Sequence, residues 1–180
     1  MKYCAECGQP VVTEVPAGDN RPRAVCRHCG TIHYENPRLV VGCVPEYQGN
    51  ILLCRRSIEP RYGYWTLPAG FMELGESLAE AAARETWEEA RARVELGPLF
   101  ALVDVVPAGQ VHAFFTATLP RPEFAAGEET LETRLFAPDQ IPWDELAFPS
   151  VRIALERYLD NLRTGATTLY LAAAPRIRLS

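Results

Sequence analysis

Residues 70–91, GFMELGESLAEAAARETWEEAR, begin with a loop that contains Gly70 and Gly75 and continue as a predicted helix with several glutamates. Ser77 and Glu80 form an S-x-x-E capping box, which predicts that a helix begins at Leu78 and runs to about Ala90. On a helical wheel, small residues group on one side as a packing face, and the wheel predicts that the glutamates point the other way (Ala79, Ala83, Thr86 and Ala90 form the small face).

Three of these glutamates are close enough to repel one another. Glu85, Glu88 and Glu89 are spaced i, i+3 and i+4, so they lie within about one helical turn. Two charges about 4 Å apart in a partly desolvated cleft interact by roughly 4 kcal/mol at an effective dielectric near 20. A hard divalent cation with oxygen ligands removes that repulsion, and Mg²⁺ beside a phosphate is the common biological form. A solvated acidic helix face is the alternative interpretation of the three glutamates alone.

The spacing of the charged residues matches a known motif. The stretch resembles the Nudix box, G-x5-E-x7-R-E-U-x-E-E-x-G-U with U aliphatic, at Gly70, Glu76, Arg84, Glu85, Glu88 and Glu89. It departs from the pattern twice, with Thr86 at an aliphatic position and Arg91 at the glycine that would end the helix. The resemblance implies an α/β fold, the Nudix α/β/α sandwich with a mixed sheet, over about residues 37–163.

The same resemblance implies roles for the residues of the box. It assigns Mg²⁺ (or Mn²⁺) as the catalytic metal, bound by Glu85, Glu88, Glu89 and a main-chain carbonyl at Ala69 or Gly70. Arg84 would orient the catalytic carboxylate Glu85, with an ordinary surface ion pair as the alternative. The general base in this family is a box glutamate or one on a later loop, and the stretch GEETLE offers Glu128, Glu129 and Glu132. We favour Glu129 as a catalytic residue, since a loop before a strand suits a side chain that reaches toward the metal, with a solvated acidic loop as the alternative for each of the three.

Two cysteine knuckles precede this domain. C-x2-C-G occurs twice with eighteen residues between, inside the range typical of a four-cysteine zinc site (Cys4, Cys7, Cys26 and Cys29). Disulfides are the alternative, and the absence of an export signal disfavours them. We predict a structural Zn²⁺ ribbon over residues 1–36, too short to fold without metal. His28 and His33 are alternative ligands.

Composition limits the function classes. The 180 residues with 48% hydrophobic content suffice for one sizeable core and a small appendage, and no apolar run approaches the length of a membrane span. We therefore expect a cytoplasmic protein with no membrane partner. The net charge of −5 and the four basic against four acidic residues in 1–36 disfavour nucleic acid as a partner.

Further elements follow from local patterns. Alternating or apolar runs predict strands at 39–44, 51–55, 99–106, 111–119 and 133–136, with a hairpin turn at Gly49-Asn50. An apolar stripe from Val151 to Leu162 predicts a last helix that Ser150 caps and Gly165 ends. Residues 164–180 form a tail whose apolar TTLYLAAA is either an added strand or a contact with a partner subunit. We predict a homodimer, with a tail folded on its own domain as the alternative.

A zinc ribbon joined to a Nudix domain resembles hydrolases of ADP-ribose or FAD, and more distantly the NADH pyrophosphatases. The SQPWPFP-type motif of the NADH class is missing from ALVDVVPAGQVHAFF, whereas Pro107 lies fifteen residues past Ala92, as in ADP-ribose hydrolases. The resemblance thus implies hydrolysis of a small nucleotide substrate, ADP-ribose, to AMP and ribose 5-phosphate. FAD or NADH hydrolysis is the alternative, and a non-catalytic nucleotide-sensing or nucleic-acid-binding protein is a second one. Four aromatic residues are candidates for stacking on a base, with core packing as the alternative for each (Tyr62, Tyr64, Trp65 and Phe71).

Overall fold

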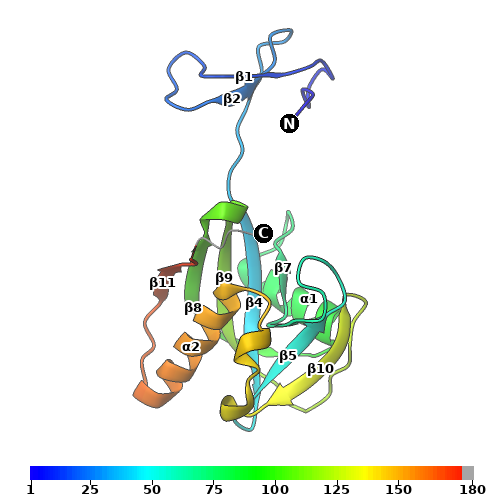
Figure 1. The fold of residues 1–180 in the computed structure, drawn as a ribbon, viewed down its shortest axis with the longest axis vertical. Coiled ribbons are helices and arrows are strands. Elements are labelled where there is room, and N and C mark those ends of the chain that lie inside the picture. The colour runs from blue at the N-terminus through cyan, green and yellow to red at the C-terminus, as the bar shows by residue number, and fades with distance from the viewer. Residues whose placement is uncertain (176–180) are drawn as a thin grey trace. The chain divides into compact units, whose positions relative to one another are not determined.

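The computed structural model describes residues 1–175 of the chain. The chain divides into two compact units, Met1–Asn36 and a larger unit that begins at Pro37. Each unit has a sheet of its own, so the two are described separately (Figure 1). The assignment of a zinc ribbon, a catalytic domain and a tail to residues 1–36, 37–163 and 164–180 stays a prediction.

The first unit is a three-stranded antiparallel sheet with two cysteine turns. Its strands, in the order β1-β2-β3, are β1 (Val12–Glu14), β2 (Arg23–Val25) and β3 (Ile32–His33). The amide of Gly8 donates to the carbonyl of Cys4, and the amide of Gly30 donates to that of Cys26. Both glycines have positive φ angles, 70° and 76°, which explains why each C-x2-C pair ends in glycine.

The second unit is built on a mixed sheet. Its strand order is β10-β5-β4-β9-β8-β11, with β6 paired to β5 and β7 paired to β4. The β4/β9 and β8/β11 pairs are parallel and the other pairs are antiparallel. The strands are β4 (Arg38–Tyr47), β5 (Asn50–Arg56), β6 (Trp65–Thr66), β7 (Ala69–Phe71), β8 (Glu95–Val105), β9 (Gln110–Thr118), β10 (Thr130–Phe136) and β11 (Tyr170–Ala173).

Two helices cover opposite faces of this sheet (Figure 1). Along β4 the buried side chains alternate, so that Val41 packs against helix α1 (Leu78–Ala90) and Val44 packs with helix α2 (Pro149–Thr164). The larger core lies under α2 and the smaller cores lie under α1. The α/β/α sandwich with a mixed sheet, preceded by a small ribbon, is confirmed.

Helix α1 begins and ends where the sequence predicts. The hydroxyl of Ser77 accepts from the amide of Glu80, and the Glu80 carboxylate accepts from the amide of Ser77 at 2.8 Å, which completes the capping box. Arg91 ends the helix in the left-handed region with φ 48°, and its amide donates to the carbonyl of Trp87. The turn that glycine makes in the Nudix pattern is therefore made here by an arginine.

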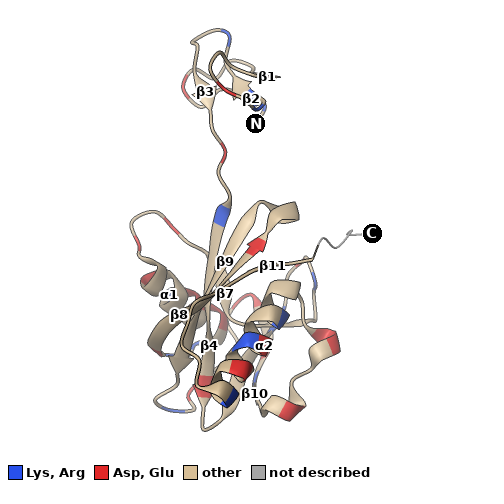
Figure 2. Ribbon diagram, turned by 90° about the vertical axis from the view of Figure 1, so that its left-hand side faces the viewer, with Lys and Arg blue, Asp and Glu red and all other residues tan. Residues whose placement is uncertain are grey.

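Helix α2 begins earlier than the sequence predicts. Its N-cap is Phe148, with no side-chain hydrogen bond, and Pro149 is the first helical residue. Ser150 is inside the helix, fully buried, and its hydroxyl bonds His112 Nδ1 at 2.9 Å, so the prediction of Ser150 as a cap was wrong. Gly165 ends the helix in the left-handed region as predicted. The solvent side of α2 carries residues of alternating charge, which form i,i+3 and i,i+4 ion pairs (Figure 2).

The remaining predictions shift by a few residues. The β4–β5 turn consists of Gln48 and Gly49, both with positive φ, and Tyr47 pairs with Asn50, so the turn lies one residue before the predicted Gly49-Asn50. One short 3-10 turn follows β8, and two more lie between β10 and α2 (Val106–Ala108, Pro138–Gln140 and Trp143–Glu145).

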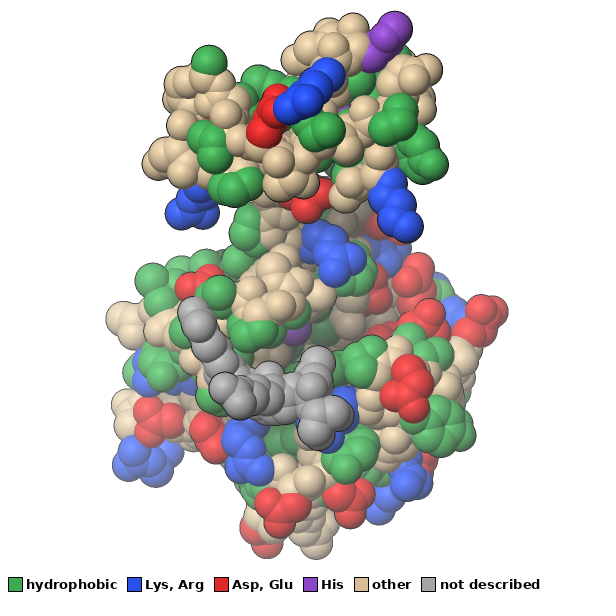
Figure 3. Space-filling view, turned by 45° about the horizontal axis from the view of Figure 1, so that its top comes forward, with side chains coloured by type: hydrophobic (Ala, Val, Ile, Leu, Met, Phe, Trp, Pro, Cys, Tyr) green, Lys and Arg blue, Asp and Glu red, His purple; other side chains and the backbone are tan. Residues whose placement is uncertain are grey.

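The tail folds onto the second unit. Residues Tyr170–Ala173 pair with β8 in parallel as an added edge strand, which is one of the two alternatives for TTLYLAAA. The end of the tail, residues 176–180, lies outside the described residues. Neither helix in residues 1–175 combines the length and apolarity needed to cross a bilayer. On the face drawn in Figure 3, the described acidic and basic side chains are interspersed.

Candidate metal and catalytic site

The short strand β7 forms the floor of the site. It pairs with the middle of β4, and α1 packs against both strands. The carboxylate of Glu85 lies directly over Gly70, where an ideal Cβ would overlap it, so only glycine admits this approach. Glu89 Oε2 accepts a hydrogen bond from the backbone amide of Ala69 at 3.1 Å. Both glutamates are about 9% exposed, which differs from the wheel prediction that they point away from the packed side.

Arg84 links the box carboxylates to one another. It binds Glu76 through two bonds, from Nε at 3.0 Å and from Nη2 at 2.7 Å. Its Nη1 donates to Glu85 Oε1 at 2.7 Å and to Glu88 Oε2 at 3.0 Å, and its Nη2 also donates to the carbonyl of Phe71. One guanidinium therefore contacts three carboxylates and the end of β7. The surface ion pair that was the alternative interpretation does not describe such a network.

Burial and neighbouring charges set the pKa values of these acids. Hydrogen bonds from Arg84 and from the Glu73 amide lower the pKa of Glu76 to about 2. Desolvation raises the pKa of Glu85, opposed by Arg84. Desolvation also raises the pKa of Glu89 to about 8, opposed by the Ala69 amide and increased by the charge of Glu85. The two buried carboxylates are costly to ionise beside each other when protein groups alone surround them.

The loop before β10 packs against the last turn of α1. The Gly127 amide donates to the carbonyl of Glu89 at 3.0 Å, and a Cβ at Gly127 would overlap the carbonyl of Glu88. The same loop carries Glu129, whose carbonyl accepts from the amide of Ser57. The charge of Glu129 contributes to the raised pKa of Glu89. The hydrogen bond from Gly127 thus holds the loop that carries Glu129 beside the end of α1.

The other acidic candidates of GEETLE are placed differently. Glu128 is exposed, and its carbonyl accepts from the hydroxyl of Ser57. Glu132 lies on β10, where its carboxylate contacts Arg134 at 2.9 Å and Arg55 at 3.8 Å. Of the two arginines that end β5, Arg56 is the one whose charge lowers the pKa of Glu89.

The donor set of the box fits a hard divalent cation. Glu85 and Glu89 offer buried carboxylate oxygens beside the backbone of β7, which are ligands that Mg²⁺ and Mn²⁺ prefer. Glu88 is half exposed and is held toward Arg84. Within residues 1–175, no three acidic groups of the box have ligand oxygens within 4.8 Å of one another, so the structure brings Glu85 and Glu89 to the same strand but does not gather all three.

Aromatic side chains near the site divide into core and surface residues. Trp65 is 3% exposed and packs edge-on against Phe136 at 4.9 Å, so it belongs to the core. Tyr62 and Phe71 are exposed, and the guanidinium of Arg38 lies 4.6 Å from the centre of the Phe71 ring. Tyr64 is half-buried, with the guanidinium of Arg61 5.3 Å from the centre of its ring. Of the four candidates, Tyr62 and Phe71 are the exposed ones.

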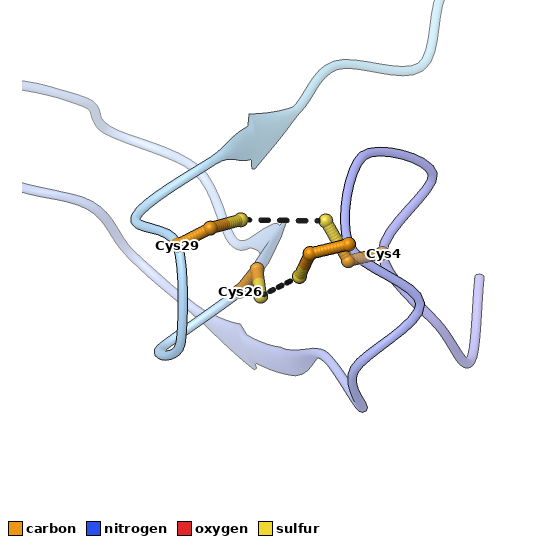
Figure 4. A group of neighbouring side chains, drawn as sticks. Cys4, Cys26 and Cys29 are labelled. Atoms are coloured by element: carbon orange, nitrogen blue, oxygen red, sulfur yellow. Dashed lines mark hydrogen bonds between the residues drawn. The ribbon is translucent and has the colours of Figure 1, made fainter.

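The four cysteines of the first unit converge (Figure 4). Their sulfur atoms all lie within 4.8 Å of one another, with 3.6 Å between Cys4 and Cys29 and 3.5 Å between Cys7 and Cys26. These separations exceed a disulfide bond and approach the edge of about 3.8 Å of a tetrahedron with Zn–S distances near 2.3 Å. Hydrogen bonds from the hydroxyl and amide of Thr31 lower the pKa of Cys29 to about 6, which favours a thiolate. The four-thiol group thus fits Zn²⁺.

The histidine alternatives are resolved by this geometry. His33 Nε2 lies 3.3 Å from Cys4 Sγ, so its contact is with a cysteine sulfur. In the described part of the chain, the group with metal-ligand spacing consists of the four cysteines alone. Neither His28 nor His33 is needed to complete a tetrahedral set.

Comparison with known families agrees with this geometry. The model of the NUDIX domain matches residues 36–157, and the Nudix N-terminal zinc-ribbon model matches residues 2–35. The chain belongs to the Nudix hydrolase family. The resemblance inferred from the box and the ribbon is confirmed.

Relatives of this Nudix chain include NAD-capped RNA hydrolases and an ADP-ribose pyrophosphatase. It is 28% identical to an NAD-capped RNA hydrolase, NudC, of Vibrio vulnificus over 92% of this chain and 62% of that protein. It is 32% identical to an ADP-ribose pyrophosphatase of Methanocaldococcus jannaschii over 67% of this chain and 72% of that protein. A NUDIX hydrolase structure from Nitrosomonas europaea superposes with a TM-score of 0.94 and 45% identity over 98% of this chain and all of that one. The chain spans between about one third and three fifths of the NudC proteins that it matches.

Proposed function

We propose that this Nudix protein hydrolyses the pyrophosphate bond of a nucleoside diphosphate derivative with the help of a divalent metal. The observation that carries the proposal is the pair of buried carboxylates, Glu85 and Glu89, set against the backbone of β7 inside a Nudix box. Burying two acids side by side is unfavourable for folding, so their presence in this motif points to chemistry. Glu85, Glu88, Glu89 and the carbonyl of Gly70 would hold Mg²⁺ or Mn²⁺.

Several protein groups position the carboxylates that would bind the metal. A bound metal would neutralise the anionic P–O–P linkage and acidify the attacking water. Arg84 holds Glu85 and Glu88 at fixed positions, and its bonds to Glu76 anchor it to the loop before the helix. Gly70 lets the Glu85 carboxylate approach the strand, and the Ala69 amide orients Glu89. These contacts fix the ligand oxygens before substrate binds.

Glu129 is our candidate for the general base. Its loop is fixed to α1 by the Gly127 amide, and its charge acts on Glu89. Glu129 is exposed to solvent, so its carboxylate is open to the water molecule that would attack the substrate.

The test of the metal site is Glu88→Gln. The change keeps the size of the side chain and removes a charged ligand, so turnover with Mg²⁺ should fall by orders of magnitude, with circular dichroism unchanged. Glu156→Gln is a matched control, because Glu156 is similarly exposed and forms an i,i+4 ion pair with Arg152 as Glu88 does with Arg84. Equal activity of Glu88→Gln and wild type across Mg²⁺ concentrations would refute the assignment.

ADP-ribose is the substrate we propose. Support comes from Pro107, which lies in the turn between β8 and β9 beside the start of β4, and from the likeness to an archaeal ADP-ribose pyrophosphatase. A second candidate is the NADH or NAD-capped RNA class, because the likeness to NudC extends over 92% of this chain, including the zinc ribbon. FAD is a third candidate. The absence of a SQPWPFP-type motif favours ADP-ribose over the NADH class.

A substrate panel would decide between them. Purified protein with Mg²⁺ is assayed on ADP-ribose, FAD, NADH, diadenosine polyphosphates and capped RNA, and the products identify the cleaved bond. We expect the highest kcat/KM on ADP-ribose, with AMP and ribose 5-phosphate as products. A higher value on NADH or capped RNA would replace the proposed substrate. Tight binding of a nucleotide without turnover on any member would favour the sensing alternative.

We further propose a homodimer in the cytoplasm. The strand β11 is the edge of the sheet and presents Leu171, 68% exposed, with Leu169 beside it. None of the six cysteines, all of which lie in residues 1–175, forms a disulfide, which suits a reducing compartment. Light scattering after size exclusion should give twice the mass of the chain, and a mass near 20 kDa with full activity would refute the dimer.

A further inference from the structure

The solvent face of α1 has a second feature that the Nudix site does not use. Trp87 is 41% exposed, and the guanidinium groups of Arg91 and Arg93 lie 5.8 and 5.0 Å from the centre of its ring. These residues line a pocket of about 380 Å³ together with Pro120, Arg121 and Glu123 from the loop after β9. A volume of this size lies within the usual range of small-ligand pockets.

The pocket is basic in an acidic protein. Its lining contains three arginines and one glutamate, a formal charge of +2, whereas the whole chain carries −5. Among residues 1–175, Arg91 and Arg93 take part in no ion pair, and Arg121 makes only a long, exposed one with Glu123 at 3.7 Å. Within the described chain, Arg91 and Arg93 therefore lack a negative charge that would balance them, and the single glutamate of the lining contacts Arg121.

Helix capping does not account for the cluster. A cation at the end of a helix complements the helix dipole, and that explains Arg91. It does not explain Arg93 or Arg121, which lie beyond the helix on separate segments. Arg91 also takes the left-handed conformation, which glycine adopts at lower cost. Arg91 thus adds a positively charged side chain to the pocket, which a glycine at this position would not.

We propose that this pocket binds a nucleoside phosphate. The exposed indole offers a flat surface for a base, and the arginines beside it offer forked donors for phosphate oxygens. The pocket is separate from the metal site, because Trp87 lies on the exposed side of α1 while Glu85 and Glu89 face β7. The ligand is a free nucleotide or one unit of an RNA chain, since both share this chemistry.

Calorimetric titration without added divalent metal separates the two sites, because the acidic metal site then has nothing to attract a phosphate. The probes are AMP, inorganic phosphate and a 5′-phosphorylated heptaribonucleotide. We expect AMP to bind more tightly than inorganic phosphate, and the affinity to fall as salt is raised. Tighter binding of the oligonucleotide than of AMP identifies RNA as the source, and equal binding identifies the free nucleotide.

Two variants and a control complete the test. Arg93→Glu and Trp87→Leu should each weaken AMP binding at least tenfold, while kcat for pyrophosphate hydrolysis stays within twofold of wild type. Arg163→Glu, on an exposed position of α2, makes the same change in net charge and should leave binding unaltered. The proposal is overturned if AMP fails to bind the wild-type protein, if Arg93→Glu binds AMP like wild type, or if Arg163→Glu loses as much affinity as Arg93→Glu.

Discussion

Acid should destabilise the second unit through one buried histidine. His112 is 8% exposed on β9, and its two ring nitrogens contact Ser150 Oγ and Gln110 Oε1, each at 2.9 Å. Burial lowers the pKa of His112 from 6.5 to about 4. Between these two pH values the folded state thus binds fewer protons than the unfolded state. The free energy of unfolding is therefore unaffected by His112 above pH 6.5 and falls as the pH drops from 6.5 toward 4.

The size of the effect follows from the same two pKa values. At pH 5 the imidazole is protonated in the unfolded chain and largely neutral in the fold, which costs about 2 kcal/mol, rising to about 3 kcal/mol near pH 4. Urea unfolding at pH 7 and pH 5, followed by circular dichroism at 222 nm, measures the second unit, because both α-helices of the described chain lie there.

The control for this experiment is His112→Gln, which cannot titrate. Carboxylates that lose stability in acid, such as Glu76, act equally in both proteins, so the difference between the two pH dependences isolates the histidine. We expect the unfolding free energy of the variant to fall by about 2 kcal/mol less than that of wild type between pH 7 and pH 5. Parallel pH dependences for the two proteins would refute the reasoning.

Three further changes test separate parts of the structure. Gly70→Ala should lower kcat/KM at least tenfold with the fold retained, because the new Cβ displaces the Glu85 carboxylate; kinetics like wild type would exclude this role for the glycine. Metal analysis of wild type should find about one zinc per chain, which Cys7→Ser should abolish, and a zinc-free, folded and active wild type would contradict the zinc site. Thr86→Val should change the unfolding free energy by less than about 1 kcal/mol in urea unfolding, since the hydroxyl contacts only its own helix and Cys43, and a loss of several kcal/mol would reveal an essential hydrogen bond.

Local chemistry explains which elements the sequence predicted well. Helix α1 is bounded by a capping box, a signal contained within four residues, and the structure begins the helix at Leu78 as predicted. The cysteine knuckles are equally local, and their four sulfur atoms converge. The start of α2 was wrong because the hydroxyl of Ser150 bonds His112, a partner 38 residues away, which no local pattern contains.

The least predictable part of the site is its floor. The strand β7 has three residues, too few to show a period-two pattern in the sequence. The helical wheel therefore could not indicate which face of α1 packs against a strand. Because β7 was not predicted, the burial of Glu85 and Glu89 and the exposure of Ala79 were not predicted either. The glycine at position 70 was the one available signal, because a close approach of another group to the backbone requires it.

The position of Glu89 within α1 sharpens the argument for a cation. Glu89 is one residue before the last helical residue, where the helix dipole disfavours a negative charge. Burial and the charge of Glu85 act in the same direction, and the Ala69 amide and the charge of Arg56 are what oppose them. Arg84 does not relieve Glu89, since its hydrogen bonds go to Glu76, Glu85 and Glu88. A divalent cation bound by Glu85 and Glu89 would offset these unfavourable contributions together. Glu89, whose ionised form the protein destabilises through burial and neighbouring charge, would therefore be strongly stabilised by a bound metal.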